Sequence, residues 1–259
     1  MGSRGTALVT GASRGIGLAI AERLVADGWS LAMTARSSER LEAAAAGLRA
    51  AGGEVITVPA DLRDPTAAST LATAAAALGP IDLVVNNAGT APSAKLARTT
   101  DDMLAEVLDL HVAAPFRLLR EVLPGMVERG GGCAIQLAST AGLRGFPFVS
   151  AYVAAKHGMV GLTRALAVEL GSTPVRVYAV CPGFVETDIT REAAAAAADR
   201  SKRGIDEMLA GFGAMNACGR LIQPREVADA VAHLAAGAGE IASGSLYVLD
   251  EMPPVVQES

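Results

Sequence analysis

A tyrosine and a lysine four residues apart, Tyr152 and Lys156, form the pair best suited to acid–base chemistry. At that spacing in a helix, the two side chains project from the same face. A phenol has a reference pKa near 10 and is by itself a poor acid at neutral pH. An ammonium about 4 Å away, at an effective dielectric constant of about 20, would stabilise the phenolate by about 4 kcal/mol, or about three pKa units. We therefore expect Lys156 to bring the pKa of Tyr152 close to the working range.

A serine stands where a third group of such a site is needed. Ser139 follows the apolar run Cys133–Ala138, which we expect to be a buried strand. In open α/β sheets, ligands bind beyond the carboxyl ends of the strands, so this hydroxyl could hydrogen-bond a substrate carbonyl. A Tyr-x-x-x-Lys pair alone is common by chance. With Ser139 before it, the interpretation as a catalytic set becomes more specific.

A glycine-rich turn near the N-terminus is suited to binding a phosphate group. The segment 10–17, TGASRGIG, follows one predicted strand and opens the first predicted helix. Its glycines let the backbone turn tightly and approach a pyrophosphate, and the helix N-terminus supplies free N–H groups and a positive dipole. Such turns also join strands to helices without binding anything, but this context favours a nucleotide.

The acidic residue that reads an NAD ribose is missing. It is expected about 20 residues beyond the glycines, where the segment 34–37 reads TARS and has no carboxylate. Arg14 and Arg36 offer guanidinium groups instead, which pair well with phosphate. We therefore expect NADP(H), whose 2′-phosphate a carboxylate would repel, rather than NAD(H). The alternative is that both arginines are only solvated surface charges.

The elements that must position these residues alternate regularly along the chain. The predicted strands are Thr6–Thr10, Ser30–Thr34, Val55–Pro59, Leu83–Asn86, Cys133–Ala138, Val175–Cys181 and Ser245–Leu249. The predicted helices are Ile16–Ala26, Ser38–Ala50, Pro65–Leu78, Asp101–Glu128, Ala151–Leu170 and Pro224–Ala236. This alternation is typical of an α/β fold with a doubly wound (Rossmann) parallel sheet and helices on both faces. We expect residues 1–259 to form a single domain, from which the segment 184–218 departs as a lid-like excursion.

Composition narrows the class of protein further. The chain has 259 residues, 51% hydrophobic and 19% charged, which predicts a globular protein with a sizeable core. No run approaches the roughly 18 apolar residues of a membrane span, and a pI near 5.3 argues against nucleic acid as a partner. The start of the sequence does not resemble a signal peptide, and three widely spaced cysteines predict reduced thiols, so we expect a cytoplasmic protein. The histidines share no ligand spacing, and we expect no metal.

Taken together, these residues resemble the classical branch of the short-chain dehydrogenase/reductase family, and within it the 3-oxoacyl reductase-like members. The resemblance spans essentially the whole chain. It is carried by the segments 10–17 and 86–89 (NNAG), Asp61, Ser139, Tyr152, Lys156, Pro182, Gly183 and Thr187. It implies a cofactor site made of Gly11, Ser13, Arg14, Gly15, Ile16, Gly17, Arg36, Asp61, Leu62, Asn87, Ala88, Gly89, Tyr152, Lys156, Pro182, Gly183, Val185 and Thr187.

The resemblance also implies a role for each group. Asp61 would hydrogen-bond the adenine, and the segment 86–89 would brace the sheet beside the cofactor. Tyr152 would be the general acid–base, while Lys156 would bind the nicotinamide ribose and tune the phenol. The nicotinamide pocket would be lined by Pro182, Gly183 and Thr187. Family members similar to this chain move a hydride between a nicotinamide and a carbonyl or alcohol carbon.

Two positions depart from the family pattern. His111 stands where a fourth catalytic residue, usually asparagine, helps to hold a water that leads protons to the lysine. Pro115, four residues later, has no N–H and cannot close the helical bond to the His111 carbonyl. We hypothesise that this freed carbonyl keeps the water relay and that the imidazole adds a proton carrier. The alternative is a packed, neutral histidine beside a proline kink. Tyr178 replaces another usual asparagine, for which the sequence gives no physical reason.

Apolar side chains suggest the substrate and the assembly. A substrate wall is predicted from Phe184, Met208, Leu209, Phe212 and Met215 of the excursion with Leu143, Phe146 and Phe148. These residues could equally just pack the excursion onto the sheet. Surplus apolar residues on two long helices, which predict a homo-oligomer (tetramer or dimer), are Leu118, Leu119, Val122, Leu162 and Leu166. Helix-on-sheet packing within one chain is the competing explanation.

Two function hypotheses follow. The first is an NADP(H)-dependent oxidoreductase that reduces a small-molecule carbonyl substrate, either a hydrophobic ketone or a 3-oxoacyl thioester. The second is a catalytically idle NADP(H)-binding regulatory protein that has kept the fold. His111 and Tyr178 favour the second, whereas the presence of Ser139, Tyr152 and Lys156 favours the first.

Overall fold

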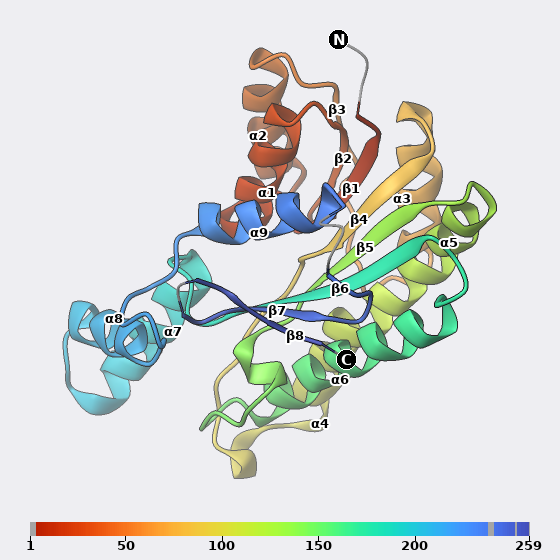
Figure 1. Ribbon diagram of the computed structural model, residues 1–259. Coiled ribbons are helices and arrows are strands. Elements are labelled where there is room, and N and C mark those ends of the chain that lie inside the picture. Colours follow the sequence, from red (N-terminus) through yellow and green to blue (C-terminus); the bar gives the residue numbers. More distant parts are fainter. Residues whose placement is uncertain (1–3, 238–240, 252, 259) are drawn as a thin grey trace.

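A computed structural model describes residues 4–237, 241–251 and 253–258. Its centre is an eight-stranded sheet in the order β3-β2-β1-β4-β5-β6-β7-β8 (Figure 1). The strands are β1 Thr6–Thr10, β2 Ser30–Thr34, β3 Val55–Thr57, β4 Ile81–Asn86, β5 Gly132–Leu137, β6 Val175–Pro182, β7 Leu246–Leu249 and β8 Val255–Gln257. The first seven strands run parallel, and β8 pairs antiparallel with β7. The doubly wound α/β architecture predicted from the alternation is thus present.

Helices cover both faces of this sheet. They are α1 Gly15–Ala26, α2 Ser38–Ala50, α3 Ala67–Ala75, α4 Asp101–Leu108, α5 Ala114–Glu128, α6 Ser150–Glu169, α7 Asp188–Ser201, α8 Ile205–Ala214 and α9 Pro224–Ala235. The core between the sheet and α1, α2 and α9 includes Ile20, Leu41 and Val231. The core on the other face, beneath α3, α5 and α6, includes Leu71 and Leu119. Buried apolar strands between two helical layers explain why the strands read as continuous apolar runs rather than alternating ones.

Local sequence signals account for several helix starts. The Ser37 hydroxyl caps α2 by accepting a hydrogen bond from the Arg40 N–H, at 3.3 Å. The Thr100 hydroxyl caps α4 in the same way, accepting from Met103 N–H at 3.2 Å. Each cap satisfies an N–H group that has no partner inside its own helix.

The sequence prediction fails at three places. The single helix expected at Asp101–Glu128 is interrupted by a π-helical turn, Asp109–Ala113, that separates α4 from α5. The strand expected at Val55–Pro59 ends at Thr57. The antiparallel strand β8 was not expected at all, because its three residues carry no alternation long enough to signal a strand.

The segment 184–218 departs from the sheet. Its helices α7 and α8 pack against each other and lie beyond the end of β6, outside the two helical layers (Figure 1). We call this segment the lid segment, and its role as a lid stays a prediction. Within the described residues, no helix is both long and apolar enough to cross a membrane.

The strand order places the site. The chain passes outward from β1 through β2 to β3, then returns to β4 on the other side of β1 and continues outward to β7. The strand order therefore reverses between β1 and β4, and crevices at the carboxyl ends of such strands bind ligands in doubly wound folds. The glycine turn after β1 and the segment 86–89 at the end of β4 meet at this crevice.

Candidate active site

The glycine turn is built so that side chains would not fit. Gly11 has a φ of +66°, and a Cβ on Gly17 would lie 2.2 Å from the Gly11 carbonyl oxygen. The Asn87 amide donates to the Thr10 carbonyl at 2.9 Å, and the Thr10 hydroxyl accepts from the N–H of Ala88 at 3.1 Å. These bonds fix the turn against the end of β4.

The first turn of α1 remains available to an anion. Its N-cap residue, Arg14, makes no side-chain capping bond, and no acidic residue lies in the first turn. The N–H groups of this helix start are therefore not covered by a side-chain cap, and the helix dipole adds positive potential there. The residues present fit the pyrophosphate of a dinucleotide, as predicted for Gly11, Ser13, Gly15, Ile16 and Gly17.

Arg14 reaches the lid segment in this structure. Its guanidinium pairs with the carboxylate of Asp188 at 2.8 Å and lies 3.7 Å from that of Glu192, both on α7. Thr187 lies against the glycine turn, since a Cβ on Gly15 would be 3.6 Å from its methyl group. The lid segment thus contacts the glycine turn directly. Arg14 is thus an exposed arginine engaged in an ion pair, and its binding to a phosphate stays a prediction.

A carboxylate–guanidinium ion pair lies where the adenosine end of the cofactor is predicted to bind. Asp61 accepts hydrogen bonds from Arg63, with 2.7 Å between Oδ2 and Nη2, and Arg63 lowers the pKa of Asp61 to about 2. Arg36 is exposed at the end of β2, and its charge also lowers the pKa of Asp61. Leu62 is half-buried against the core. Arg36 and Asp61 thus lie near each other, and their binding to the 2′-phosphate and to the adenine stays a prediction.

Ser139 and Tyr152 come together at the carboxyl end of β5. The Ser139 hydroxyl lies near enough to the Tyr152 phenol to lower the pKa of the phenol through hydrogen bonding. Ser139 Oγ also accepts from the Ala141 N–H at 3.1 Å and lies 3.4 Å from the Pro182 carbonyl oxygen. Tyr152 is half-buried near the start of α6. Both hydroxyls therefore face one place, beside the end of β6.

The expected effect of Lys156 on the phenol is wrong for this structure. The Lys156 ammonium donates to the Leu137 carbonyl at 2.5 Å and lies over the Tyr152 ring, 5.6 Å from its centroid. Burial raises the pKa of Tyr152 to about 12 and lowers the pKa of Lys156 to about 7. The ammonium is bonded to this main-chain carbonyl, and desolvation exceeds the attraction that the spacing alone suggests.

His111 is buried in the π-helical turn, with 1% of its surface exposed. Burial, and secondarily the Lys156 charge, lower its pKa to about 3. An imidazole with this pKa is neutral at physiological pH and does not readily take up a proton, and its suggested role as a proton carrier stays a prediction. The packed, neutral histidine beside Pro115 is what the structure shows. The role of its freed carbonyl stays a prediction.

Sequence reasoning missed three groups around the site. Asn216 is buried between α8 and α9, and its amide bonds both the N–H and the carbonyl of Phe184, at 2.8 and 2.9 Å. The Leu137 and Thr90 carbonyls hold Lys156 and His111. The only signal in the sequence that could have pointed to Asn216 is that a polar residue stands within the lid segment. Main-chain carbonyls leave no signal in a sequence, because every residue carries one.

Tyr178 now has a physical account. Its ring is buried in the core, and its hydroxyl donates to the Ile241 carbonyl at 3.0 Å. A tyrosine is tolerated in a core when its hydroxyl reaches a partner. Tyr178 therefore packs the middle of β6 into the core and gives no support to the hypothesis of a catalytically idle protein.

An aromatic cluster joins the loop after Ser139 to the lid segment. Phe184 stacks on Phe212 with ring centroids 4.7 Å apart, and Phe146 meets Phe184 nearly at right angles at 6.0 Å. Phe148 and Met215, by contrast, are exposed at 51% and 45%. Three of the aromatic residues predicted for the substrate wall thus pack the lid segment onto the body of the protein, and their contact with a substrate stays a prediction.

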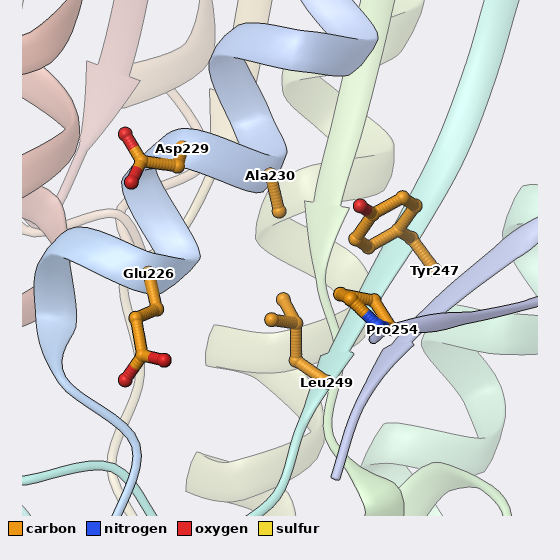
Figure 2. A pocket seen from close by; sticks show the side chains of 6 residues that line it. All are labelled: Glu226, Asp229, Ala230, Tyr247, Leu249 and Pro254. Atoms are coloured by element: carbon orange, nitrogen blue, oxygen red, sulfur yellow. The ribbon is translucent and has the colours of Figure 1, made fainter. Parts of the chain in front are cut away.

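A hollow of about 310 Å³ lies elsewhere, between α9 and the β7–β8 edge (Figure 2). It is lined by Glu226, Asp229, Ala230, Tyr247, Leu249 and Pro254. Its two carboxylates are occupied by ion pairs, Glu226 with Arg220 at 2.7 Å and Asp229 with Arg23. None of the predicted site residues lies in this hollow. Across the part of the chain that the structure describes, no three His, Cys, Asp or Glu side chains are grouped to hold a metal.

Comparison with known proteins supports the same class. Residues 5–198 match the family model described as short chain dehydrogenase. The chain is 38% identical over 246 residues to a Streptomyces coelicolor protein provisionally named ketoacyl reductase, covering 93% of this chain and 94% of that protein. It is 36% identical, with the same coverage, to 3-oxoacyl-acyl-carrier-protein reductase FabG of Escherichia coli.

Solved structures agree with the sequence relatives. A variant of actinorhodin polyketide ketoreductase with NADPH superposes with a TM-score of 0.90 and is 36% identical, covering 96% of this chain and 97% of that chain. Levodione reductase superposes with a TM-score of 0.90 at 31% identity and the same coverage. A doubly wound sheet with a Ser–Tyr–Lys set beside a glycine turn defines a nucleotide-dependent oxidoreductase. The chain belongs to the short chain dehydrogenase family.

Proposed function

We propose that this protein is an NADP(H)-dependent oxidoreductase of the cytoplasm that reduces a hydrophobic ketone or a 3-oxoacyl thioester. The observation that carries the proposal is the pair of hydroxyls, Ser139 and Tyr152, at the same carboxyl-terminal edge of the parallel sheet as the glycine turn. Relatives named for ketoacyl reduction, and a superposable ketoreductase solved with NADPH, support the substrate class and the cofactor.

The cofactor would be bound along the crevice between β1 and β4. The glycine turn and the start of α1 would hold the pyrophosphate, and Arg36 with Arg14 would hold the 2′-phosphate. The ends of β4 and β6 would flank the nicotinamide through Asn87, Ala88, Gly89, Pro182, Gly183, Val185 and Thr187. The bound, reduced nicotinamide would supply the hydride that reaches the substrate carbonyl carbon.

The side chains of this chain would supply the proton and hold the substrate. With a pKa of about 12, the Tyr152 phenol keeps its proton at neutral pH and can donate it to a carbonyl oxygen. The Ser139 hydroxyl, near the same phenol, holds that oxygen in place. For the phenol to become a better acid, the Lys156 ammonium must leave the Leu137 carbonyl and approach the phenol oxygen.

The aromatic cluster supports a hydrophobic substrate. Phe146 and Phe184 extend from the ends of β5 and β6, the same edge that carries Ser139. Apolar surface next to a few convergent polar groups is the usual composition of a small-molecule site.

The test is turnover of NADPH with a panel of hydrophobic ketones and β-keto thioesters. We expect loss of NADPH absorbance with wild type, and at least a thousandfold lower rate with Tyr152→Phe, because general acid catalysis is worth about 10²–10⁴ and the phenol also orients the substrate. NADPH affinity should stay within a few-fold. Tight NADPH binding without turnover of any substrate would favour the idle regulatory protein instead.

We further propose that the protein is a homo-oligomer, a tetramer or dimer. The apolar residues that the sequence offered for this interface are used within the chain. Leu118, Leu119 and Val122 are buried in the chain's own core, and Leu162 and Leu166 pack against that core. They therefore give the oligomer no support. Other apolar side chains on the same helices remain exposed, Phe116 at 48% and Val168 at 83%. These now support the proposal.

A further inference from the structure

His111 is fixed by the main chain that follows β4. Its Nε2 lies 2.8 Å from the Thr90 carbonyl oxygen and 3.2 Å from the Thr90 nitrogen. The imidazole also lies directly against Gly89, where a Cβ would come within 2.5 Å of Cε1. The ring therefore has little freedom to rotate, because the contacts that restrain it belong to backbone atoms.

The same imidazole touches the ring of Tyr152. The two ring centroids are 5.4 Å apart, and the ring planes make an angle of 85°. This perpendicular arrangement is favourable for aromatic pairs and adds about 0.5–1.5 kcal/mol to the burial of area in comparable pairs. Tyr152 also packs against the cluster of aliphatic side chains that contains Val107, Ala151 and Ala155, and the Lys156 ammonium lies over its ring. Among these neighbours, His111 is the one whose own ring meets that of Tyr152.

An asparagine could not make this contact, since its amide carries no ring. The buried imidazole is neutral, as its pKa of about 3 requires. A neutral ring does not repel the nearby Lys156 ammonium, which an imidazolium would. Position 111, where the family resemblance implies an amide, therefore carries a ring that packs on the residue expected to donate the proton.

We propose that His111 is a positioning residue, whose imidazole is fixed by Thr90 and holds the Tyr152 ring so that the phenol points toward the substrate carbonyl. This inference rests on the proposed function, because it assigns Tyr152 as the proton donor. The imidazole of His111 also connects the catalytic tyrosine to the loop at the end of β4. That loop is predicted to contact the cofactor through Ala88 and Gly89.

Two substitutions separate the two contacts of the imidazole. His111→Gln keeps an amide N–H at about the reach of Nε2, so the bond to Thr90 can persist while the ring contact is lost. His111→Phe keeps a ring against Tyr152 but cannot bond Thr90. We expect His111→Gln to lower kcat about five- to tenfold with NADPH Kd within twofold. We expect His111→Phe to raise NADPH Kd at least threefold, with a smaller loss in kcat.

A matched control and a readout without turnover complete the test. His157→Gln makes the same change on an exposed histidine of α6, and we expect it to leave kcat and Kd unchanged. In NMR spectra of ring-labelled tyrosine, Tyr152 is assigned by its absence in Tyr152→Phe. His111→Gln should shift its resonance but not those of Tyr178 and Tyr247.

The results that overturn this inference differ from those that overturn the proposed function. A His111→Gln enzyme with kcat within twofold of wild type, or with an unshifted Tyr152 resonance, would show that the ring contact positions nothing. Equal losses in kcat, Kd and Tm for both variants would show a merely structural role. If wild type reduces no substrate, the proposed function fails, and the Tyr152 resonance alone then decides this inference.

Discussion

Three titratable side chains at the centre of the site have pKa values shifted by the same cause. Burial lowers the pKa of His111 to about 3 and that of Lys156 to about 7, and raises that of Tyr152 to about 12. In each case the uncharged form is favoured, because little water reaches these groups. At mildly alkaline pH the site is therefore kept nearly free of charge, which suits the approach of an apolar substrate, whereas near pH 7 Lys156 is still an ammonium in about half of the molecules.

The depressed pKa of His111 predicts acid lability. In the unfolded chain, the imidazole takes up a proton below about pH 6.5, whereas in the folded protein it does so only near pH 3. The unfolded state therefore binds more protons in this range, and stability falls as pH drops. At about 1.4 kcal/mol per pH unit, His111 should contribute about 2 kcal/mol of destabilisation between pH 7 and pH 5.

Urea unfolding at pH 7 and pH 5 checks this value. His111→Gln should lose less stability than wild type over the same interval, by about 2 kcal/mol. His157→Gln should behave like wild type, because its imidazole is exposed. Equal pH sensitivity in wild type and His111→Gln would contradict the assignment of His111 as the buried neutral group.

Arg36 predicts the choice between cofactors. It is exposed at the end of β2 and forms no ion pair among the residues that the structure describes, whereas Arg14 is engaged by Asp188. Arg36→Asp should shift the ratio of kcat/KM for NADPH over NADH at least tenfold toward NADH, since a carboxylate would repel the 2′-phosphate. Arg40→Asp, the same charge change on an exposed residue of α2, serves as the control. An unchanged ratio would contradict the proposed NADP(H) preference.

At the scale of elements, the periodicity of the sequence predicted most of the fold. The alternation of apolar and amphipathic runs predicted seven strands and the helices between them, because burial between two helical layers leaves a strong pattern. The chemistry-bearing residues Ser139 and Tyr152 came together as predicted. The predictions that failed depend on main-chain atoms, which leave no pattern in a sequence. The Leu137 carbonyl binds the Lys156 ammonium, and the π-helical turn follows from local backbone geometry.

The π-helical turn carries its own prediction. In this turn the Ala114 N–H bonds the carbonyl of Asp109, five residues earlier, and Pro115 follows with no N–H to offer His111. Pro115→Ala would restore that N–H, allowing an ordinary helical bond to the His111 carbonyl. If this carbonyl holds the relay water, the substitution should lower kcat several-fold.

The chain provides a matched comparison for that experiment. Pro124 lies within the same helix, α5, far from the turn, so Pro124→Ala changes helix propensity without touching His111. Steady-state reduction rates of both variants, beside His111→Asn, give the answer. A Pro115→Ala enzyme as fast as wild type would end the freed-carbonyl hypothesis.

At the scale of the whole molecule, exposed apolar side chains predict association. Phe116 on α5 and Val168 on α6 are exposed at 48% and 83%, and helices that display such residues are often covered by another subunit. Light scattering should give a mass that is a multiple of 26.2 kDa. Phe116→Glu should lower that mass, whereas Leu96→Glu, on an exposed loop residue, should not. A monomeric wild type would refute the proposed oligomer.

The short strand β8 has a practical consequence for handling the protein. Val255 and Val256 pair with Val248 and Tyr247 and so cover the outer edge of β7 with the chain's own C-terminal residues. A version truncated before β8 would present unpaired amide and carbonyl groups along β7, and an uncovered edge recruits strands from other molecules. Shortened forms should therefore precipitate more readily, and an affinity tag is safer at the other terminus.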